Sequence, residues 1–96
     1  MNSKDRAYLR SLANTVEPIL QVGKSGITDN LIKQVNDALE ARELIKITVL
    51  ETAPEDAKET AIKLSNNSNS VVVQVLGRKI TLYRKRKKDS KISIDV

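Results

Sequence analysis

The sequence predicts an α+β fold, a two-layer sandwich in which three helices pack against a mixed four-stranded sheet. Helical and strand-like patterns alternate along the chain in the order α-β-α-β-α-β-β. A strand–helix–strand unit in the first half favours two parallel strands joined by a right-handed crossover. In the second half, a glycine-containing pair between two β-branched runs predicts an antiparallel hairpin.

Composition limits the chemistry that this chain can perform. Its 96 residues suffice for one small domain with an aliphatic core, because the chain has two Tyr and no Phe or Trp. It also has no Cys and no His, which excludes disulfides, thiolate or imidazole zinc sites and nucleophile–His catalysis. No pair of acidic residues stands beside an evident pocket. We therefore expect a non-enzymatic protein without a cofactor, metal or small-molecule substrate.

The first helix is predicted over residues 4–16. One apolar face is formed by residues at three- and four-residue spacing: Leu9, Leu12, Ala13 and Val16. Arg6 and Arg10 lie largely off this face, one turn apart. They form either a solvated surface or a ridge that binds nucleic-acid backbone. Pro18 is expected to end the helix.

The middle of the chain contains the strand–helix–strand unit. Residues 19–22 and 44–50 are apolar runs typical of strands, and a helical stripe extends between them from about Asp29 to Arg42. Residues 52–55 have the spacing of a capping box, so the third helix is expected to begin there. Residues 65–70 are polar and turn-prone, which predicts a loop.

Two more strands are predicted, over residues 71–76 and 79–84, and the pair Gly77-Arg78 lies between them. A Gly-X pair between β-runs fits a two-residue hairpin of type II′. Tyr83 is expected to be a sheet residue with its hydroxyl in water, and stacking on a base is the alternative.

The position of the charge is more informative than its total. The net charge is +5, and residues 84–88 alone carry five positive charges, so the rest of the chain is neutral overall. A local basic cluster on a neutral body predicts contact with a polyanion in one place. We divide the chain into a domain of residues 1–85 and a basic tail of residues 86–96. This tail is either flexible or adds a weak edge strand.

The candidate binding site is a loop of two glycines separated by two polar residues: Gly23, Lys24, Ser25 and Gly26. The glycines allow a sharp turn and a close approach to a neighbour, because neither carries a Cβ. Thr28 can cap the following helix, whose backbone N–H groups and positive dipole end then lie beside the loop. Together with Lys24, this corner can hold a phosphate. A Walker-type P-loop is excluded, because that motif needs a glycine where Pro18 stands.

Three segments, in this order and spacing, resemble the CRM domain (chloroplast RNA splicing and ribosome maturation) in its single-domain bacterial, YhbY-like form. They are PILQVGKSGIT (18–28), ELIKI (43–47) and VQVLGRKITLYR (73–84), and the resemblance covers about residues 4–85. It implies a fold similar to the C-terminal domain of translation initiation factor three. It also implies RNA binding through the G-x-x-G loop and neighbouring basic residues. Bacterial members of this family associate with precursors of the large ribosomal subunit.

We therefore expect a cytoplasmic protein that binds structured ribosomal RNA during large ribosomal subunit assembly. The expected contacts come from the loop, the first helix, the hairpin and the tail: Gly23, Lys24, Ser25, Gly26, Arg6, Arg10, Arg78, Lys79, Arg84, Lys85 and Arg86. The alternatives are an architectural DNA-binding protein and an adaptor whose basic tail docks an acidic protein. No membrane partner is expected, because the N-terminus is polar and no apolar span could cross a bilayer. The oligomeric state is left open.

Overall fold

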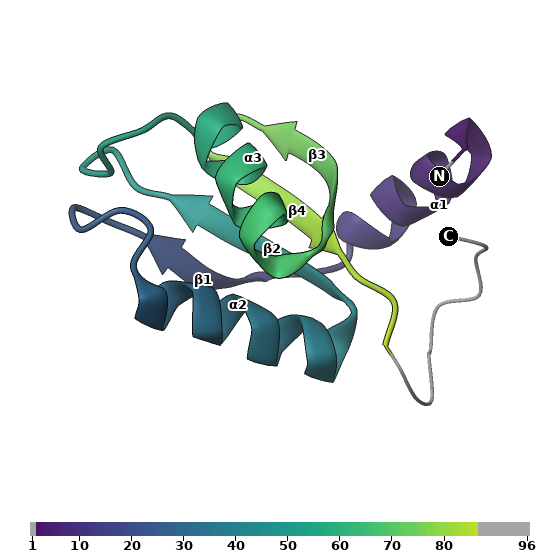
Figure 1. The fold of residues 1–96 in the computed structure, drawn as a ribbon. Helices are drawn as coiled ribbons and strands as arrows, with labels where there is room; N and C mark the ends of the chain where they lie inside the picture. Colours follow the sequence, from purple (N-terminus) through teal and green to yellow (C-terminus); the bar gives the residue numbers. More distant parts are fainter. Residues whose placement is uncertain (1, 87–96) are drawn as a thin grey trace.

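The computed structural model describes residues 2–86, and their elements follow the predicted order (Figure 1). These elements are α1 (Ser3–Ala13), β1 (Pro18–Val22), α2 (Asp29–Arg42), β2 (Leu44–Val49), α3 (Ala57–Ser68), β3 (Val71–Leu76) and β4 (Lys79–Tyr83). The α+β class and the mixed four-stranded sheet are therefore confirmed. The edge strand considered for the tail falls outside the described residues.

The four strands form one sheet in the order β1-β2-β4-β3. β1 and β2 run parallel, as expected for strands joined by the crossover helix α2. β4 lies between β2 and β3 and is antiparallel to both. β1 and β3 are thus the edge strands.

The topology gives the sheet two distinct ends. At one end, the Leu50 N–H donates to the Val22 carbonyl oxygen (2.9 Å) and the Val49 N–H donates to the Arg78 carbonyl oxygen (2.7 Å). The loop after β1 and the β3–β4 turn therefore lie together, at what we call the loop end. Gly77 in that turn has a φ of +59°, and Arg78 does not have a positive φ, as a type II′ turn requires. The opposite end, where the chain leaves β4, is the tail end.

α2 and α3 cover one face of the sheet (Figure 1). β2 shows how this face is built, because its alternate residues Ile45, Ile47 and Val49 point toward the helices. The buried core on this side is aliphatic, as the composition predicted: Val22, Leu31, Val35, Leu39, Ile45, Ile47, Val49, Ala57, Ala61, Leu64, Ile80 and Leu82.

α1 packs on the other face of the sheet, at the tail end. A second buried cluster joins Leu9 of α1 to Leu44, Val73 and Tyr83 in three different strands. The two-layer arrangement is thus formed by the sheet with α2 and α3. α1 adds a partial cover on the opposite side.

Two boundaries predicted for the helices are wrong for local reasons. α1 ends at Ala13, before the predicted residue 16. The N–H groups of Thr15 and Val16 bond only three residues back, to the carbonyl oxygens of Leu12 and Ala13, and so do not continue the α-helix. α3 does not begin in the predicted capping box at residues 52–55. Its N-cap is Asp56, whose carboxylate accepts a hydrogen bond from the Glu59 N–H (2.8 Å).

The predicted loop at residues 65–70 is wrong as well, because α3 continues to Ser68. Polar side chains in its last turn bond to carbonyl groups of the preceding turn. Ser65 donates to Ile62 (2.9 Å) and Ser68 donates to Leu64 (2.7 Å), so these turn-prone residues remain helical. Asn69 then ends the helix in the left-handed conformation, with a φ of +51°.

Candidate functional site

The loop after β1 is a tight turn closed by a hydrogen bond from the Gly26 N–H to the Gly23 carbonyl oxygen (2.9 Å). The central residues, Lys24 and Ser25, are exposed. Gly26 has a φ of +67°, and a Cβ at this position would lie 2.9 Å from Cγ of Pro54. Glycine is therefore required here both for its conformation and for the space it leaves. We call residues 23–26 the glycine turn.

Gly23 is under weaker constraint. Its φ lies outside the left-handed region, and an added Cβ would make an ordinary contact of 3.7 Å with Cδ1 of Leu50. The sharp turn and close approach expected of both glycines are thus found at Gly26 and not at Gly23.

Thr28 caps α2 as predicted, because its Oγ1 accepts a hydrogen bond from the Leu31 N–H (3.1 Å). A hollow of about 290 Å³ lies between the glycine turn and the first turns of α2. Its lining is Gln21, Gly23, Lys24, Ser25, Gly26, Thr28, Asn30, Leu31 and Gln34. Within residues 2–86 no carboxylate lines this hollow, and the positive end of the α2 dipole lies beside it. The hollow is therefore suited to an anion.

Three amide side chains in this lining were missed by the sequence analysis: Gln21, Asn30 and Gln34. Asn30 and Gln34 are one helical turn apart and so share a face of α2, a spacing that is visible in the sequence. Their relation to the glycine turn becomes visible only once the turn is placed. Primary amides both donate and accept hydrogen bonds, so they extend the contacts that this site can offer.

The hairpin brings Arg78 and Lys79 to the loop end of the sheet, near the glycine turn. Nη2 of Arg78 lies 3.7 Å from Oε1 of Glu51, and both side chains are more than half exposed. Exposed ion pairs of this kind contribute little free energy. Arg78 can therefore exchange Glu51 for a phosphate at little cost.

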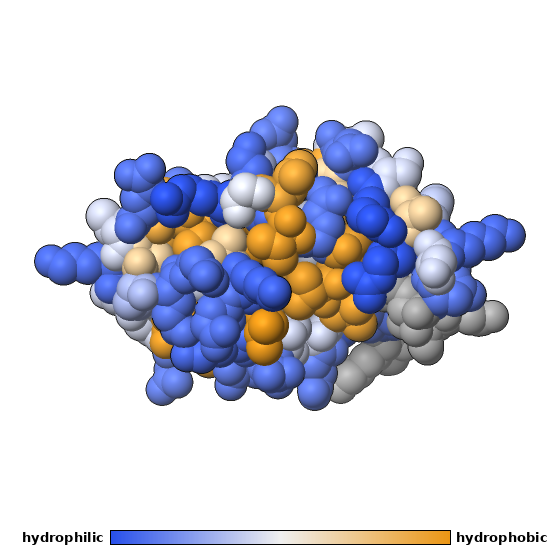
Figure 2. Space-filling model, turned by 90° about the horizontal axis from the view of Figure 1, so that it is seen from above, coloured by the Kyte–Doolittle hydropathy of each residue, from blue (hydrophilic) through white to orange (hydrophobic). Residues whose placement is uncertain are grey.

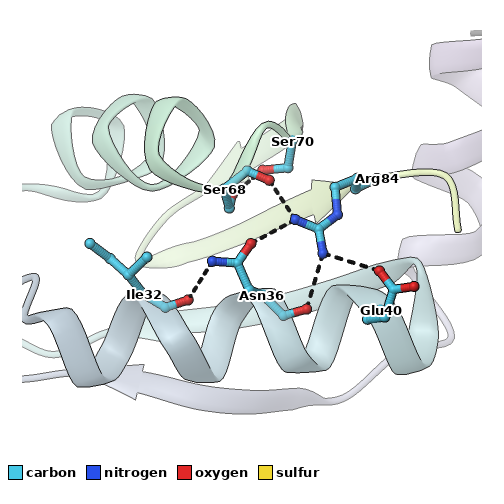
Figure 3. Close-up of polar contacts among 6 residues, drawn as sticks. All are labelled: Ile32, Asn36, Glu40, Ser68, Ser70 and Arg84. Atoms are coloured by element: carbon cyan, nitrogen blue, oxygen red, sulfur yellow. Dashed lines mark hydrogen bonds and ion pairs between the residues drawn. The ribbon is translucent and has the colours of Figure 1, made fainter. Parts of the chain in front are cut away.

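Arg84 lies at the tail end and is held by protein groups (Figure 3). Its Nη1 donates to Oδ1 of Asn36 (2.6 Å) and to the Ser68 carbonyl oxygen (2.7 Å). Its Nη2 donates to the Asn36 carbonyl oxygen (3.1 Å) and lies 3.5 Å from Oε2 of Glu40. The side chain is only 23% exposed. These contacts join the end of β4 to α2 and α3, which gives the guanidinium a structural role.

Arg6 is engaged in a similar way at the edge strand. Its Nη1 donates to the Val72 carbonyl oxygen (2.8 Å) and, over a longer distance, to that of Val73 (3.4 Å). The β3–β4 pairing shifts register between Val72 and Gln74, and such irregularities disrupt the ladder of backbone hydrogen bonds. Arg6 therefore holds α1 against the irregular part of β3.

The predicted binding residues fall into two groups at opposite ends of the sheet. The loop-end group comprises Gly23, Lys24, Ser25, Gly26, Arg78 and Lys79. The tail-end group comprises Arg6, Arg10, Arg84, Lys85 and Arg86. Strands of five to six residues separate the groups, a distance of roughly 17–20 Å. The sequence had suggested one local basic contact, whereas the structure separates the predicted residues into two groups.

Tyr83 is buried beneath α1 and is 1% exposed. Neither a hydroxyl in water nor stacking on a base fits this position, so both interpretations of Tyr83 are wrong. Its hydroxyl finds no hydrogen-bond partner among the described residues. Burial raises the pKa of the Tyr83 phenol, and the negative charges of Glu43 and Asp5 add to this effect.

A second hollow, apolar in character, lies over α3 and β3. It is lined by Lys58 and by apolar side chains: Ala61, Ile62, Val72 and Val75. Figure 2 shows apolar side chains gathered on this face between hydrophilic margins. This lining is unsuited to phosphate, and it shares no residue with the hollow at the glycine turn.

Residues 2–86 contain no group of three or more His, Cys, Asp or Glu that could hold a metal ion. None of the helices α1 to α3 is long and apolar enough to cross a membrane.

Comparison with known proteins agrees with this architecture. Residues 1–84 match the family model of the CRS1 / YhbY (CRM) domain. The chain is 45% identical over 94 residues to the Bacillus subtilis protein named "Probable RNA-binding protein YqeI", and the alignment covers 98% of each. A Haemophilus influenzae protein named "RNA-binding protein" is 28% identical over 85 residues, which are 88% of this chain and 85% of the relative.

A solved structure has a similar fold and a similar sequence. The solution structure of SAV1595 from Staphylococcus aureus has 46% sequence identity and a TM-score of 0.83, and the match covers 99% of each chain. Fold and glycine turn together define a small α+β domain with a polar hollow beside a helix N-terminus. The chain belongs to the CRS1 / YhbY (CRM) domain family, as the three sequence segments had indicated.

Proposed function

We propose that this protein binds structured RNA without catalysing a reaction, and that its target is ribosomal RNA in precursors of the large subunit. The observation that carries this proposal is the exposed glycine turn at the N-terminus of α2, with Lys24 at its centre and a hollow free of carboxylates beside it. Membership of the CRM family and the names of the relatives as RNA-binding proteins support RNA as the partner.

In this proposal the glycine turn holds phosphate groups. Backbone N–H groups, the Ser25 hydroxyl and the Lys24 ammonium supply the donors, and Gly26 keeps the backbone within reach of the ligand. Arg78 and Lys79 extend the contact along the loop end. Because phosphates carry no sequence information, most of the affinity is independent of sequence.

The tail-end group contributes a second contact through Arg10, Lys85 and Arg86. Arg6 and Arg84 add positive charge there and position their neighbours, since their guanidinium groups already hold protein groups. In this proposal, residues 1–85 form the RNA-binding domain, and residues 86–96 form a tail that adds further charge. Since the proposed target is a ribosomal precursor, the proposal also includes a cytoplasmic location.

Binding to a large-subunit ribosomal RNA fragment, measured over a range of salt concentrations, tests the proposal. If about five phosphates are engaged, log K should fall with log salt at a slope of roughly −3 to −4.5. A slope near zero contradicts phosphate binding. Preference for duplex DNA over the RNA at matched salt would instead identify an architectural DNA-binding protein. Co-sedimentation with ribosomal particles that survives RNase and loop mutation, but not tail removal, would identify an adaptor.

A further inference from the structure

The sheet face opposite α2 and α3 is only partly covered. α1 contacts the tail end of this face, where it packs on Leu44, Val73 and Tyr83. Because strand side chains alternate, the central strands β2 and β4 direct polar residues to this side, of which Lys46, Thr48 and Lys79 reach the surface and Thr81 is buried between them. We call Lys46, Thr48 and Lys79 the open face.

The two lysines of the open face are diagonal neighbours. Lys46 pairs with Thr81 and Thr48 pairs with Lys79, which places the two lysines on a diagonal roughly 7–8 Å apart, with their Cβ atoms somewhat closer. Neither ammonium group forms an ion pair with another residue in the range 2–86. β2 and β4 contain no acidic residue, so these like charges repel each other until an anion lies over them.

The open face connects the loop-end group to α1, which carries Arg6 and Arg10 of the tail-end group. Lys79 follows Arg78 at the loop end, and Lys46 lies two residues from Leu44, which α1 covers at the tail end. Positive charge therefore continues along the sheet from the glycine turn to α1. A ligand that reaches from the glycine turn to α1 on this side of the sheet lies over Lys79 and Lys46, which favours negative charge along this length.

The open face is suited to an RNA double helix and not to a single strand. Proteins that bind single strands stack the bases on aromatic side chains, whereas double-helical RNA presents phosphates and 2′-hydroxyl groups. The chain has two Tyr and no Phe or Trp. Tyr83 is buried in the second core cluster, and Tyr8, which is exposed, lies on α1 and not on the open face. The ammonium groups of Lys46 and Lys79 and the hydroxyl group of Thr48 match the backbone of a duplex.

From these observations we infer that the open face is the floor of the RNA-binding surface, and that an RNA duplex lies along it from the glycine turn to α1. Lys46 and Lys79 each contact a phosphate of this duplex. The inference rests on the RNA-binding function proposed above and adds to it a class of RNA, a surface and a residue, Lys46.

Charge reversal on the open face tests the inference. The variant Lys46→Glu/Lys79→Glu is compared with a matched control, Lys33→Glu/Lys58→Glu, which changes the net charge equally on the exposed sides of α2 and α3. The probes are a ribosomal RNA hairpin with a stem of about 16 base pairs, the span of a double-stranded RNA-binding domain, and an unstructured strand of equal length. Circular dichroism melting verifies that both variants are folded.

The open-face variant is expected to lose at least about tenfold more affinity for the hairpin than the control loses. The slope of log K against log salt should become less steep by about 1.8, because two phosphate contacts are lost. If the two variants bind alike while Lys24→Glu weakens binding, the open face is not part of the site and the proposed function stands. If Lys24→Glu also leaves binding unchanged, the proposed function fails. Tighter binding of the unstructured strand by the unmodified protein overturns the duplex assignment.

Discussion

Arg84 binds Asn36 twice, once at the side-chain oxygen (2.6 Å) and once at the backbone carbonyl oxygen (3.1 Å). The two residues lie 48 positions apart in the sequence, so this pair fixes the end of β4 against the middle of α2. The same guanidinium also binds the carbonyl group of Ser68 at the end of α3 (Figure 3). The basic residues that follow β4 therefore start from a fixed point on the domain.

Replacing Arg84 should lower stability more than it lowers RNA affinity. Arg84→Lys keeps the charge but cannot reproduce a planar fork of several donors, and it leaves acceptor groups of Asn36 and Ser68 without a partner. We expect a loss of about 1–3 kcal/mol in the free energy of unfolding, measured by urea denaturation. The exposed Lys85→Ala variant is the control and should unfold as the unmodified protein does. Equal stability of Arg84→Lys and the unmodified protein would contradict the structural role.

The two glycines of the turn should respond differently to alanine. Gly26→Ala places a Cβ 2.9 Å from Cγ of Pro54 at a positive φ, so it should lower the free energy of unfolding by about 1–3 kcal/mol. Gly23→Ala meets Leu50 at 3.7 Å and should change stability by less than about 0.5 kcal/mol. Thermal unfolding of the two variants in parallel checks this order. A larger loss for Gly23→Ala would show that the turn is constrained differently.

Lys24→Glu should separate binding from stability. Lys24 is exposed, so its replacement should leave the free energy of unfolding within about 0.5 kcal/mol of the unmodified value. RNA affinity should fall because a negative charge then faces the phosphates. Fluorescence anisotropy with the ribosomal RNA fragment measures the loss, and Lys33→Glu on α2 serves as a control of equal charge. Unchanged affinity for Lys24→Glu would remove the glycine turn from the binding site.

Tyr83→Phe should change the response of stability to alkaline pH. The folded state raises the pKa of the Tyr83 phenol, so the unfolded chain loses this proton first, near the ordinary pKa of about 10. The folded protein then holds more protons than the unfolded chain, and stability falls as the pH rises from about 10 through the raised pKa. Tyr83→Phe lacks this loss, and at pH 7 it is expected to be as stable as the unmodified protein or slightly more stable.

Urea denaturation of both proteins from pH 8 to pH 11 measures the difference in their free energies of unfolding. This difference should be constant below about pH 9 and should then grow in favour of Tyr83→Phe. The raised pKa of Lys63, caused chiefly by its hydrogen bond to Glu55, is common to both proteins and cancels in the comparison. Parallel curves over the whole range would show that the Tyr83 phenol reaches solvent when folded.

The sequence by itself determined the features that depend on neighbouring residues. α2 has the predicted bounds, Asp29–Arg42, because the Thr28 cap and the apolar period of the helix are both local. The turn at Gly77 was predictable for the same reason. The three family segments also identified the CRM domain, since their order is a property of the chain and not of its packing.

Tertiary structure decided what distant segments do to one another. Residues 52–55 and 56–59 both have capping-box spacing, and α3 begins at the second of them. The first segment makes tertiary contacts instead: Pro54 lies against Gly26, and Glu55 pairs with Lys63 (2.5 Å). α1 packs on the sheet face opposite α2 and α3 and buries Tyr83. The position of Tyr83 within a strand did not reveal this burial.

The same holds for the charges. Arg6 and Arg84 carry the charge expected of a binding surface, but their partners are carbonyl, amide and carboxylate oxygens of other elements, 16 to 67 residues away. A sequence shows which residues carry charge. Only the folded chain shows which of these charges already hold the protein together and which, like Lys24 and Lys46, stand without such a partner among the described residues.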